Sequence, residues 1–221
     1  HIAIETTFGN LRYFKRLPEG TECAVATSKV INLSDVFGDS DQTNKFVTRY
    51  LQSTHCDLFF ADAAILVEGV AESMLLPHFI RSKFPELYQR YITILGVNGR
   101  HAHRLSPLIE KLCLPTLVIT DLDPAEKEGY HKSVVPKRGE GQISGNYAIA
   151  KWLMKEKDID KLVDYSEDKK EFSFASPYRF SIRLAYQTPV KVDFEGEEKE
   201  AIPGTFEDCL IYTNYDLFKK I

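Results

Sequence analysis

A short apolar run followed by two acids is the feature that most constrains how this chain can fold. Residues 63–67 (Ala-Ala-Ile-Leu-Val) have the length and composition of a buried strand, which Glu68 and Gly69 end. Gly69 allows the backbone to turn, and a helical pattern begins at Val70 with Glu72 in its first turn. Ligands bind at the carboxyl ends of strands in open α/β sheets. This stretch therefore predicts a strand, a turn and a helix, with two carboxylates beside one strand end.

A second segment, residues 116–123, follows the same logic. Its apolar strand closes with Asp121, and Asp123 follows two residues later. If the two strands are parallel neighbours, Glu68 and Asp121 emerge at the same edge of the sheet. Glu72 lies one helical turn beyond Gly69, and Asp123 points to the same side of an extended segment as Asp121. The pattern predicts that four carboxylates meet.

Four converging carboxylates without basic partners would repel one another and raise one another's pKa values. A divalent cation is the usual resolution, and ligands that are all oxygen favour Mg²⁺, Mn²⁺ or Ca²⁺ over Zn²⁺. A single Glu-Gly or Asp-x-Asp pair is common and usually caps a strand or helix. The joint occurrence after two apolar strands favours a metal site formed by Glu68, Glu72, Asp121 and Asp123.

The order of the remaining elements predicts an α/β fold with a parallel sheet flanked by helices. Pro77 is expected to kink the helix that contains it, and Met74, Leu75 and Ile80 are expected on its core face. Asn146 is expected to cap a helix. The strands are predicted at 10–16, 28–33, 63–67, 91–97 and 117–120, and the helices at 40–62, from 70 towards 84, from 106 onward, and from 146 to 155.

After Pro124 the pattern loosens, and an appended helical and β-rich part is expected later in the chain. Residues 126–142 read as a charged loop, 158–171 as a solvated run of mixed charge, 172–192 as β-rich and 195–200 as an acidic turn. Thr205 fits the N-cap of a helix through Asn214, with Asp208 three residues on.

Composition places few limits on function. Hydrophobic residues make up 43% and charged residues 27%, and 28 basic against 32 acidic residues leave a net charge of −4. No general basic footprint for nucleic acid is present, although acids that bind cations would themselves contribute negative charge. The four cysteines form no C-x-x-C pair, which disfavours zinc knuckles and favours a reducing cytoplasm. No apolar run is long enough for a membrane span, and the first residue, His1, indicates a fragment.

Two of these stretches together resemble the Toprim domain of topoisomerases, primases and related nucleases. They are Ile-Leu-Val-Glu-Gly-Val-Ala-Glu at 65–72 and Val-Ile-Thr-Asp-Leu-Asp at 118–123. More closely, the chain resembles the C-terminal nuclease region of the overcoming-lysogenization-defect (OLD) family of ATP-dependent endonucleases, from about Asn44 to the end. Further stretches that carry this resemblance are 58–61, 145–153, 185–190 and 205–214.

The resemblance implies a Rossmann-like Toprim fold and cleavage of DNA by a two-metal mechanism with Mg²⁺ or Mn²⁺, at a site that Ca²⁺ could also occupy. One metal would lower the pKa of an attacking water and the other would stabilise the leaving 3′ oxygen. Glu68, Glu72, Asp121 and Asp123 match the Toprim acids, and Glu207 matches an acid of the Thr-Phe-Glu segment, a fifth metal ligand.

The resemblance also implies partners outside this region. Family members carry an N-terminal ABC-type ATPase, and since no G-x-x-x-x-G-K-[ST] occurs here, ATP is expected to bind only in that missing domain. A homodimer of the full-length protein is expected, and no membrane. Residues 1–40 are expected to be the ATPase tail or a linker, 41–155 the Toprim core, and 156–221 the segment that completes the nuclease region. A catalytic lysine is implied downstream of the Thr-Phe-Glu segment. Lys219 and Lys220 do not match its context, so it is expected beyond Ile221.

Two other readings stay open. Asp-x-Asp after a strand also occurs in phosphotransferases that form an aspartyl phosphate, but that chemistry leaves Glu68 and Glu72 unexplained. The chain could also be a non-catalytic DNA- or protein-binding module. For phosphate contacts, the candidates are His101, His103, Lys137, Arg138, Lys151 and Arg183, each with an ordinary surface role as the alternative.

Overall fold

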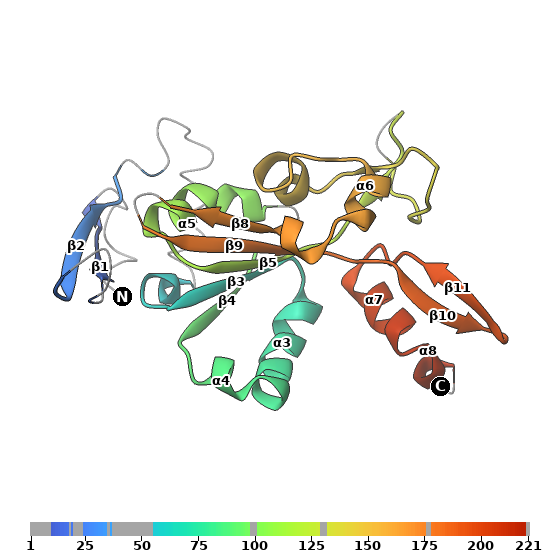
Figure 1. Ribbon diagram of the computed structural model, residues 1–221, viewed down its shortest axis with the longest axis horizontal. Coiled ribbons are helices and arrows are strands. Elements are labelled where there is room, and N and C mark those ends of the chain that lie inside the picture. Colours follow the sequence, from blue (N-terminus) through green and yellow to red (C-terminus); the bar gives the residue numbers. More distant parts are fainter. Residues whose placement is uncertain are drawn as a thin grey trace.

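A five-stranded mixed sheet forms the centre of the molecule in the computed structural model (Figure 1). The structure describes residues 10–17, 19, 24–34, 36, 55–97, 101–128, 132–175 and 178–219. The strand order is β4-β3-β5-β9-β8, in which β4, β3, β5 and β9 run parallel and β8 is antiparallel to β9. These strands are β3 (Ala63–Val67), β4 (Ile92–Gly96), β5 (Thr116–Ile119), β8 (Glu171–Phe174) and β9 (Phe180–Ala185).

Helices cover both faces of this sheet, as expected for a mainly parallel sheet. The longest described helix, α3 (Val70–Lys83), lies on one face with α4 (Pro85–Tyr88), and α5 (Ser106–Leu112) lies on the other (Figure 1). The remaining helices are η2 (Cys56–Phe59), η3 (Ala102–Leu105), the π-helix η4 (Ala148–Trp152), α6 (Ile159–Asp164), η5 (Glu167–Lys170), α7 (Phe206–Thr213) and α8 (Tyr215–Phe218).

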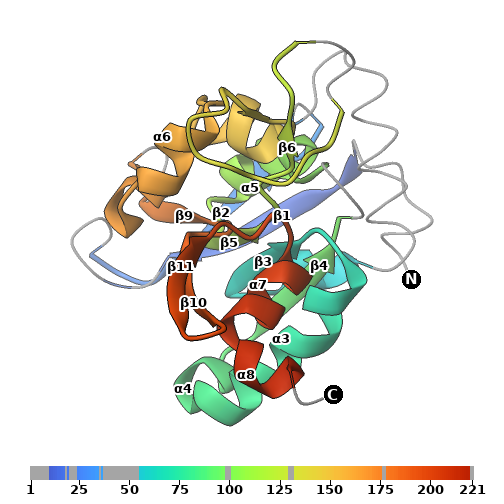
Figure 2. The ribbon, with the colours of Figure 1, turned by 90° about the vertical axis from the view of Figure 1, so that its right-hand side faces the viewer.

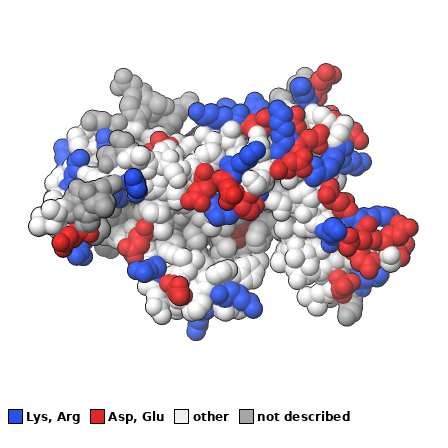
Figure 3. Space-filling model, viewed as in Figure 1, with Lys and Arg blue, Asp and Glu red and all other residues white. Residues whose placement is uncertain are grey.

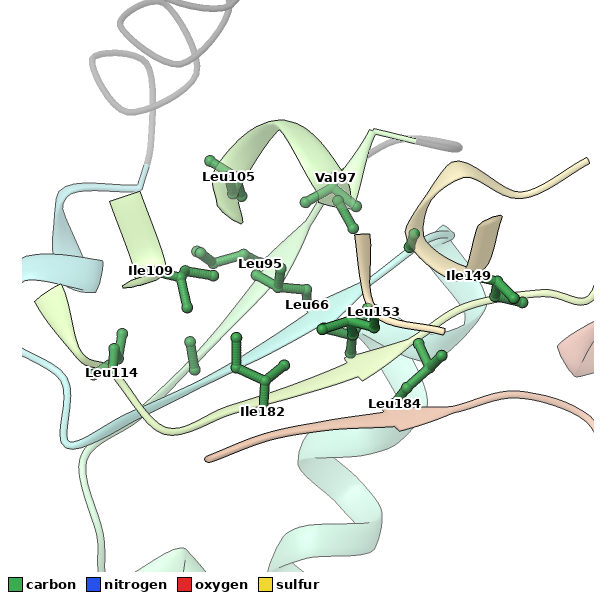
Figure 4. Packing of buried hydrophobic residues seen from close by; sticks show 14 of the residues in the cluster. Leu66, Leu95, Val97, Leu105, Ile109, Leu114, Ile149, Leu153, Ile182 and Leu184 are labelled. Carbon is green, nitrogen blue, oxygen red and sulfur yellow. The ribbon is translucent and has the colours of Figure 1, made fainter. Parts of the chain in front are cut away.

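The two faces of the sheet bury unequal cores, because alternate residues of a strand point to opposite sides. In β3, Leu66 belongs to the large cluster under α5 and η4, whereas Ile65 and Val67 belong to a small cluster with Ile80 of α3. Figure 4 shows the large cluster, in which strand residues lie against Ile109 and other residues of the covering helices. Burial on both faces explains why β3 is apolar throughout.

Small two-stranded sheets lie outside this centre. They pair β1 (Arg12–Leu17) with β2 (Thr27–Asn32), β6 (Pro124–Ala125) with β7 (Ile143–Ser144), and β10 (Val190–Phe194) with β11 (Glu197–Ala201). Lys15 attaches the first hairpin to the centre, since its Nζ donates to the carbonyl groups of Leu112 and Cys113 at 2.7 and 3.0 Å. A cation at a helix C-terminus is favourable.

Most of the expected elements of the first half are confirmed. The strands at 10–16, 28–33, 63–67, 91–97 and 117–120 correspond to β1, β2, β3, β4 and β5, and the helices from 70 and from 106 to α3 and α5. Met74 is 73% exposed, so its expected place on the core face of α3 is wrong. α3 continues through Pro77 to Lys83 without ending.

Other expectations differ from the structure. Residues 40–54 of the helix expected at 40–62 lie outside the described residues, and of the rest only Cys56–Phe59 is helical, as a 3-10 turn. The turn expected at 195–200 covers only Glu195 and Gly196, because Glu197–Ala201 forms β11. Within the described part of the chain, no helix is long and apolar enough to cross a membrane.

The central sheet also runs past residue 155. β9 pairs with β5 and β8 pairs with β9, so residues 171–185 complete the same sheet as β3. Phe180, Ile182 and Leu184 of β9 are buried in the large cluster, which is the physical reason for their place there. An α/β Rossmann-like fold with an extra β-rich part is confirmed, while the expected boundary at 155 cuts across its sheet.

Candidate active site

The parallel strands place polar side chains at the carboxyl end of the sheet. Glu68 follows β3 directly, Asp121 lies two residues after β5, and Gln187 lies two residues after β9. β3, β5 and β9 are adjacent in the sheet, so their carboxyl ends meet. This is the crevice position at which ligands bind in open α/β sheets.

Glu68 is held by three donors from different parts of the chain. All three donate to its Oε2 atom: Thr120 Oγ1 at 2.5 Å, the Asp121 backbone N–H at 3.1 Å and Asn146 Nδ2 at 3.1 Å. Among the described residues, its other oxygen, Oε1, accepts no hydrogen bond. The carboxylate is therefore fixed through one oxygen and keeps the second available for a ligand.

Asp121 has a similar arrangement. Its Oδ1 atom accepts from Gln187 Nε2 at 2.6 Å and from the backbone N–H of Phe206, at the start of α7, at 3.0 Å. The pKa of Asp121 is raised to about 7, mainly by burial and also by the negative charges of Glu68, Glu72 and Asp123, while the Gln187 hydrogen bond acts to lower it. The carboxyl group is thus poised to lose its proton near neutral pH or on meeting a cation.

Glu72 lies in the first turn of α3 and is only 2% exposed. Burial raises the pKa of its carboxyl group, as do the charges of Glu207 and Glu68, while backbone N–H groups of Glu72 and Gly69 partly offset this. A Cβ atom on Gly69 would lie 2.6 Å from Glu72 Oε2. The glycine therefore permits the close approach of this carboxylate to the backbone.

Glu207 reaches this region through α7, which lies beside α3 in both ribbon views (Figures 1 and 2). The capping box predicted at the start of this helix is confirmed. Asp208 N donates to Thr205 Oγ1, and Asp208 Oδ2 accepts from Thr205 N, both at 3.2 Å. The Glu207 side chain is exposed and close enough to Glu72 to raise its pKa.

Asp123 adopts a left-handed backbone conformation, with φ 47°, which Asp tolerates better than most residues. Its carbonyl oxygen accepts from Gly145 N at 2.8 Å and its Oδ2 from Asn146 Nδ2 at 3.1 Å. The structure thus brings the four acids of the two motifs, and Glu207, into one electrostatically coupled group.

Three uncharged residues of this network were not predicted as site residues. The hydroxyl group of Thr120 donates to Glu68. Asn146 was expected only to cap a helix, and Gln187 had no assigned role, but both are buried and donate to the acids. A signal was present, since Asn146 and Gln187 each lie in a stretch that carried the OLD resemblance.

The donor chemistry of the group fits a hard divalent cation, because every candidate ligand is a carboxylate oxygen. Raised pKa values of Asp121 and Glu72 fit as well, since a cation would relieve the repulsion that raises them. Across the described residues, however, no three His, Cys, Asp or Glu side chains are already arranged to hold a metal ion. The acids lie near one another, but their carboxylate oxygens are not positioned as the ligands of one metal ion.

Basic side chains lie on the neighbouring helices η3 and η4. His101, at the start of η3, has a pKa lowered by burial and by Arg104, and raised in part by the charge of Glu68. Tyr147 is 42% exposed; the His103 ring meets it edge-on at 5.4 Å, and Lys151 Nζ lies 3.9 Å from its centroid. We call His101, His103, Arg104, Tyr147 and Lys151 the η3–η4 wall.

Two of the other basic candidates, Arg138 and Arg183, are engaged in ion pairs. Arg138 contacts Glu200 at 2.7 Å and Asp164 at 2.8 Å, and Arg183 contacts Glu167 at 2.9 Å. Basic and acidic side chains interleave over the face in Figure 3, and acidic residues gather on the β10–β11 hairpin. These contacts give Arg138 and Arg183 structural roles on the surface.

Comparison with known proteins agrees with this geometry. Residues 59–123 match the family described as overcoming lysogenization defect protein-like, TOPRIM domain. Endonuclease GajA of Bacillus cereus (strain HuB5-5) is 28% identical over 175 residues, which are 79% of this chain. The chain spans 23% of the length of that relative. Residues 59–123, which carry the four acids of the two motifs, therefore correspond to an OLD-like Toprim domain.

Proposed function

We propose that this chain is the nuclease region of a DNA endonuclease that cleaves phosphodiester bonds with Mg²⁺ or Mn²⁺. The observation that carries the proposal is the group of carboxylates at the ends of β3 and β5, in which Asp121 has a pKa raised to about 7 by burial and neighbouring acids. The OLD-like Toprim match and the similarity to a protein named as an endonuclease support it.

In this proposal, Glu68, Glu72, Asp121, Asp123 and Glu207 hold the cations. Bound Mg²⁺ or Mn²⁺ would activate the attacking water and stabilise charge on the leaving oxygen of the phosphodiester. Glu68 and Asp121 are prepared for this because each is anchored through one oxygen, which leaves Oε1 and Oδ2 without a hydrogen bond from any described residue.

Arg104 and Lys151 of the η3–η4 wall would provide the positive charge that the acids lack. No basic group is among the charges that shift the pKa of Asp121 or Glu72. We propose that the η3–η4 wall contacts the DNA backbone next to the cleaved bond. Lys151 is exposed there, and Tyr147 lies between Asn146 and the first residue of η4. Cations that contact phosphate position the strand without reading its sequence.

The wider organisation is part of the same proposal. In the full protein, an ABC-type ATPase that binds ATP would precede this region, with residues 1–40 as its tail. Residues 41–155 would form the Toprim core together with β8 and β9, the rest of 156–221 would complete the nuclease region, and a homodimer would act in the cytoplasm.

The test combines metal binding with plasmid nicking. Wild-type protein should bind Mn²⁺ by calorimetry and nick supercoiled plasmid when Mn²⁺ is present but not with EDTA. Glu68→Gln and Asp121→Asn should lose both, whereas Glu86→Gln, an exposed glutamate of α4, should keep both. Cleavage by both site variants at the wild-type rate would refute the proposal. Mn²⁺ binding without cleavage would favour a binding module.

A further inference from the structure

Asn146 occupies the centre of the acidic site without being charged. It lies between β7 and η4 and is completely buried. Its Nδ2 atom lies 3.1 Å from Glu68 Oε2, 2.8 Å from Thr120 Oγ1 and 3.1 Å from Asp123 Oδ2. One side chain therefore connects the acid that follows β3 with the loop that follows β5.

The orientation of this amide is set by its other end. Asn146 Oδ1 accepts from the backbone N–H of Ala148 at 2.9 Å, and Asn146 N donates to Ser144 Oγ at 3.1 Å. Since the oxygen must accept from η4, the NH₂ group must point towards the carboxylates. The π-helix thus holds Asn146 in the one orientation that donates to the acids.

A neutral donor suits this place better than a cation would. Lys or Arg between Glu68 and Asp123 would also hold the two carboxylates, but its charge would repel a divalent cation. The amide group satisfies one oxygen of each acid and leaves their negative charge in place. Carboxylate ligands in metal sites are commonly held by such hydrogen bonds, and losing one typically weakens metal affinity about 10- to 100-fold.

We propose that Asn146 is a positioning residue, which sets Glu68 and Asp123 for cation binding from the start of η4. The cation itself rests on the proposed function, whereas the hydrogen bonds that hold the acids do not. Asn146 contacts no substrate in this proposal, so its loss should change the metal requirement and leave DNA affinity unaltered.

Asn146→Ser separates this role from support of η4. A serine oxygen can accept from the N–H group two residues on, as Asn146 does from Ala148, but it has no arm that reaches Glu68 and Asp123. Calorimetry of Asn146→Ser should show Mn²⁺ affinity weakened about 10- to 100-fold. DNA affinity measured at a Ca²⁺ concentration that saturates both proteins should equal wild type. Asn214→Ala removes an exposed, hydrogen-bonded asparagine at the end of α7 and should change neither value.

Each outcome decides the inference. Wild-type Mn²⁺ affinity in Asn146→Ser would overturn the inference. The same holds if Mn²⁺ affinity falls only in a second variant, Asn146→Ala, and its Tm falls as well. Either result would mean that Asn146 only supports η4. If the wild-type protein binds no Mn²⁺, the proposed function fails. The role of Asn146 in holding Glu68 is then tested without metal, by a double-mutant cycle of Asn146→Ser and Glu68→Gln. The Tm losses of Asn146→Ser and Glu68→Gln should then be less than additive in the double variant. Additive losses would overturn the inference.

Discussion

The carboxyl group of Glu72 lies where a side chain at position 69 would have to go. Gly69→Ala would place a Cβ atom 2.6 Å from Glu72 Oε2, and the flexible glutamate would move away rather than the backbone. We expect the free energy of unfolding to change by no more than about 1 kcal/mol. Cleavage should fall about 10²-fold, since a displacement of about 1 Å at a reacting centre has that effect. Urea unfolding and plasmid nicking measure the two quantities, and a variant as active as wild type would contradict the expectation.

In the proposed function, Asp121 would bind the cation at the expense of stability. In Asp121→Asn, Oδ1 can still accept from Gln187 and Phe206, while the repulsion from Glu68, Glu72 and Asp123 disappears. The metal-free variant should be more stable by about 1 kcal/mol, which is about 2–4 °C in Tm for a chain of this size. Mn²⁺ should no longer raise its Tm. Asp216→Asn, at an exposed position of α8, serves as the control and should leave both values unchanged. A lower Tm in Asp121→Asn would show that the charge stabilises the fold.

At the scale of elements, the capping box positions α7 against the sheet edge. Thr205→Ala removes the acceptor for Asp208 N and should cost about 1 kcal/mol of stability. The first turn of α7 carries Glu207 and also the Phe206 N–H group, which donates to Asp121. Mn²⁺ affinity should therefore fall as well. Thr213→Ala, at the other end of the helix, should affect neither. Thermal unfolding and calorimetry compare the two variants, and equal effects would refute a specific role for the cap.

The helices η3 and η4 are expected to serve the nucleic acid. Lys151→Ala should weaken DNA binding in Ca²⁺ without changing Mn²⁺ affinity. The slope of log DNA affinity against log salt concentration should become shallower by about the amount that one phosphate contact contributes. Lys83→Ala, at the exposed end of α3, is the matched control. Fluorescence anisotropy at several salt concentrations gives both slopes. An unchanged slope for Lys151→Ala would remove the wall from the proposed DNA path.

For the whole molecule, we expect the acids to make stability depend on pH and on the proposed metal together. The pKa of Asp121 is about 7 in the folded chain and about 3.9 in an unfolded one. Between these values the folded state keeps a proton that the unfolded state has released, so stability falls as pH rises from about 4 to 7. Mn²⁺ competes with that proton and should raise Tm more at pH 8 than at pH 5.

Thermal unfolding in EDTA and in Mn²⁺ at pH 5, 6, 7 and 8 checks this expectation. The fall in metal-free Tm should be smaller in Asp121→Asn, whose side chain does not titrate. If the two proteins showed parallel pH profiles, the titration would belong to other groups.

Local sequence patterns determined the elements and the acids of this protein. The strands and helices on either side of Glu68 and Asp121 follow from apolar periodicity and turn residues, which act over a few positions. Parallel strands that end in carboxylates then bring those carboxylates together. The helical start at Thr205 was readable for the same local reason.

Only the tertiary structure decided which strands are neighbours and which uncharged groups join the acids. β9 pairs with β5 although more than fifty residues separate them, so the sheet passes the expected boundary at 155 and brings Gln187 to Asp121. Asn146 reaches Glu68 because the segment between β7 and η4 returns to the ends of the strands, where Gly145 N donates to the Asp123 carbonyl oxygen, and not because of its local pattern. Acidic residues can be predicted as site residues from their type and spacing in the sequence. A buried amide becomes part of a site only through long-range packing, which the local sequence does not show.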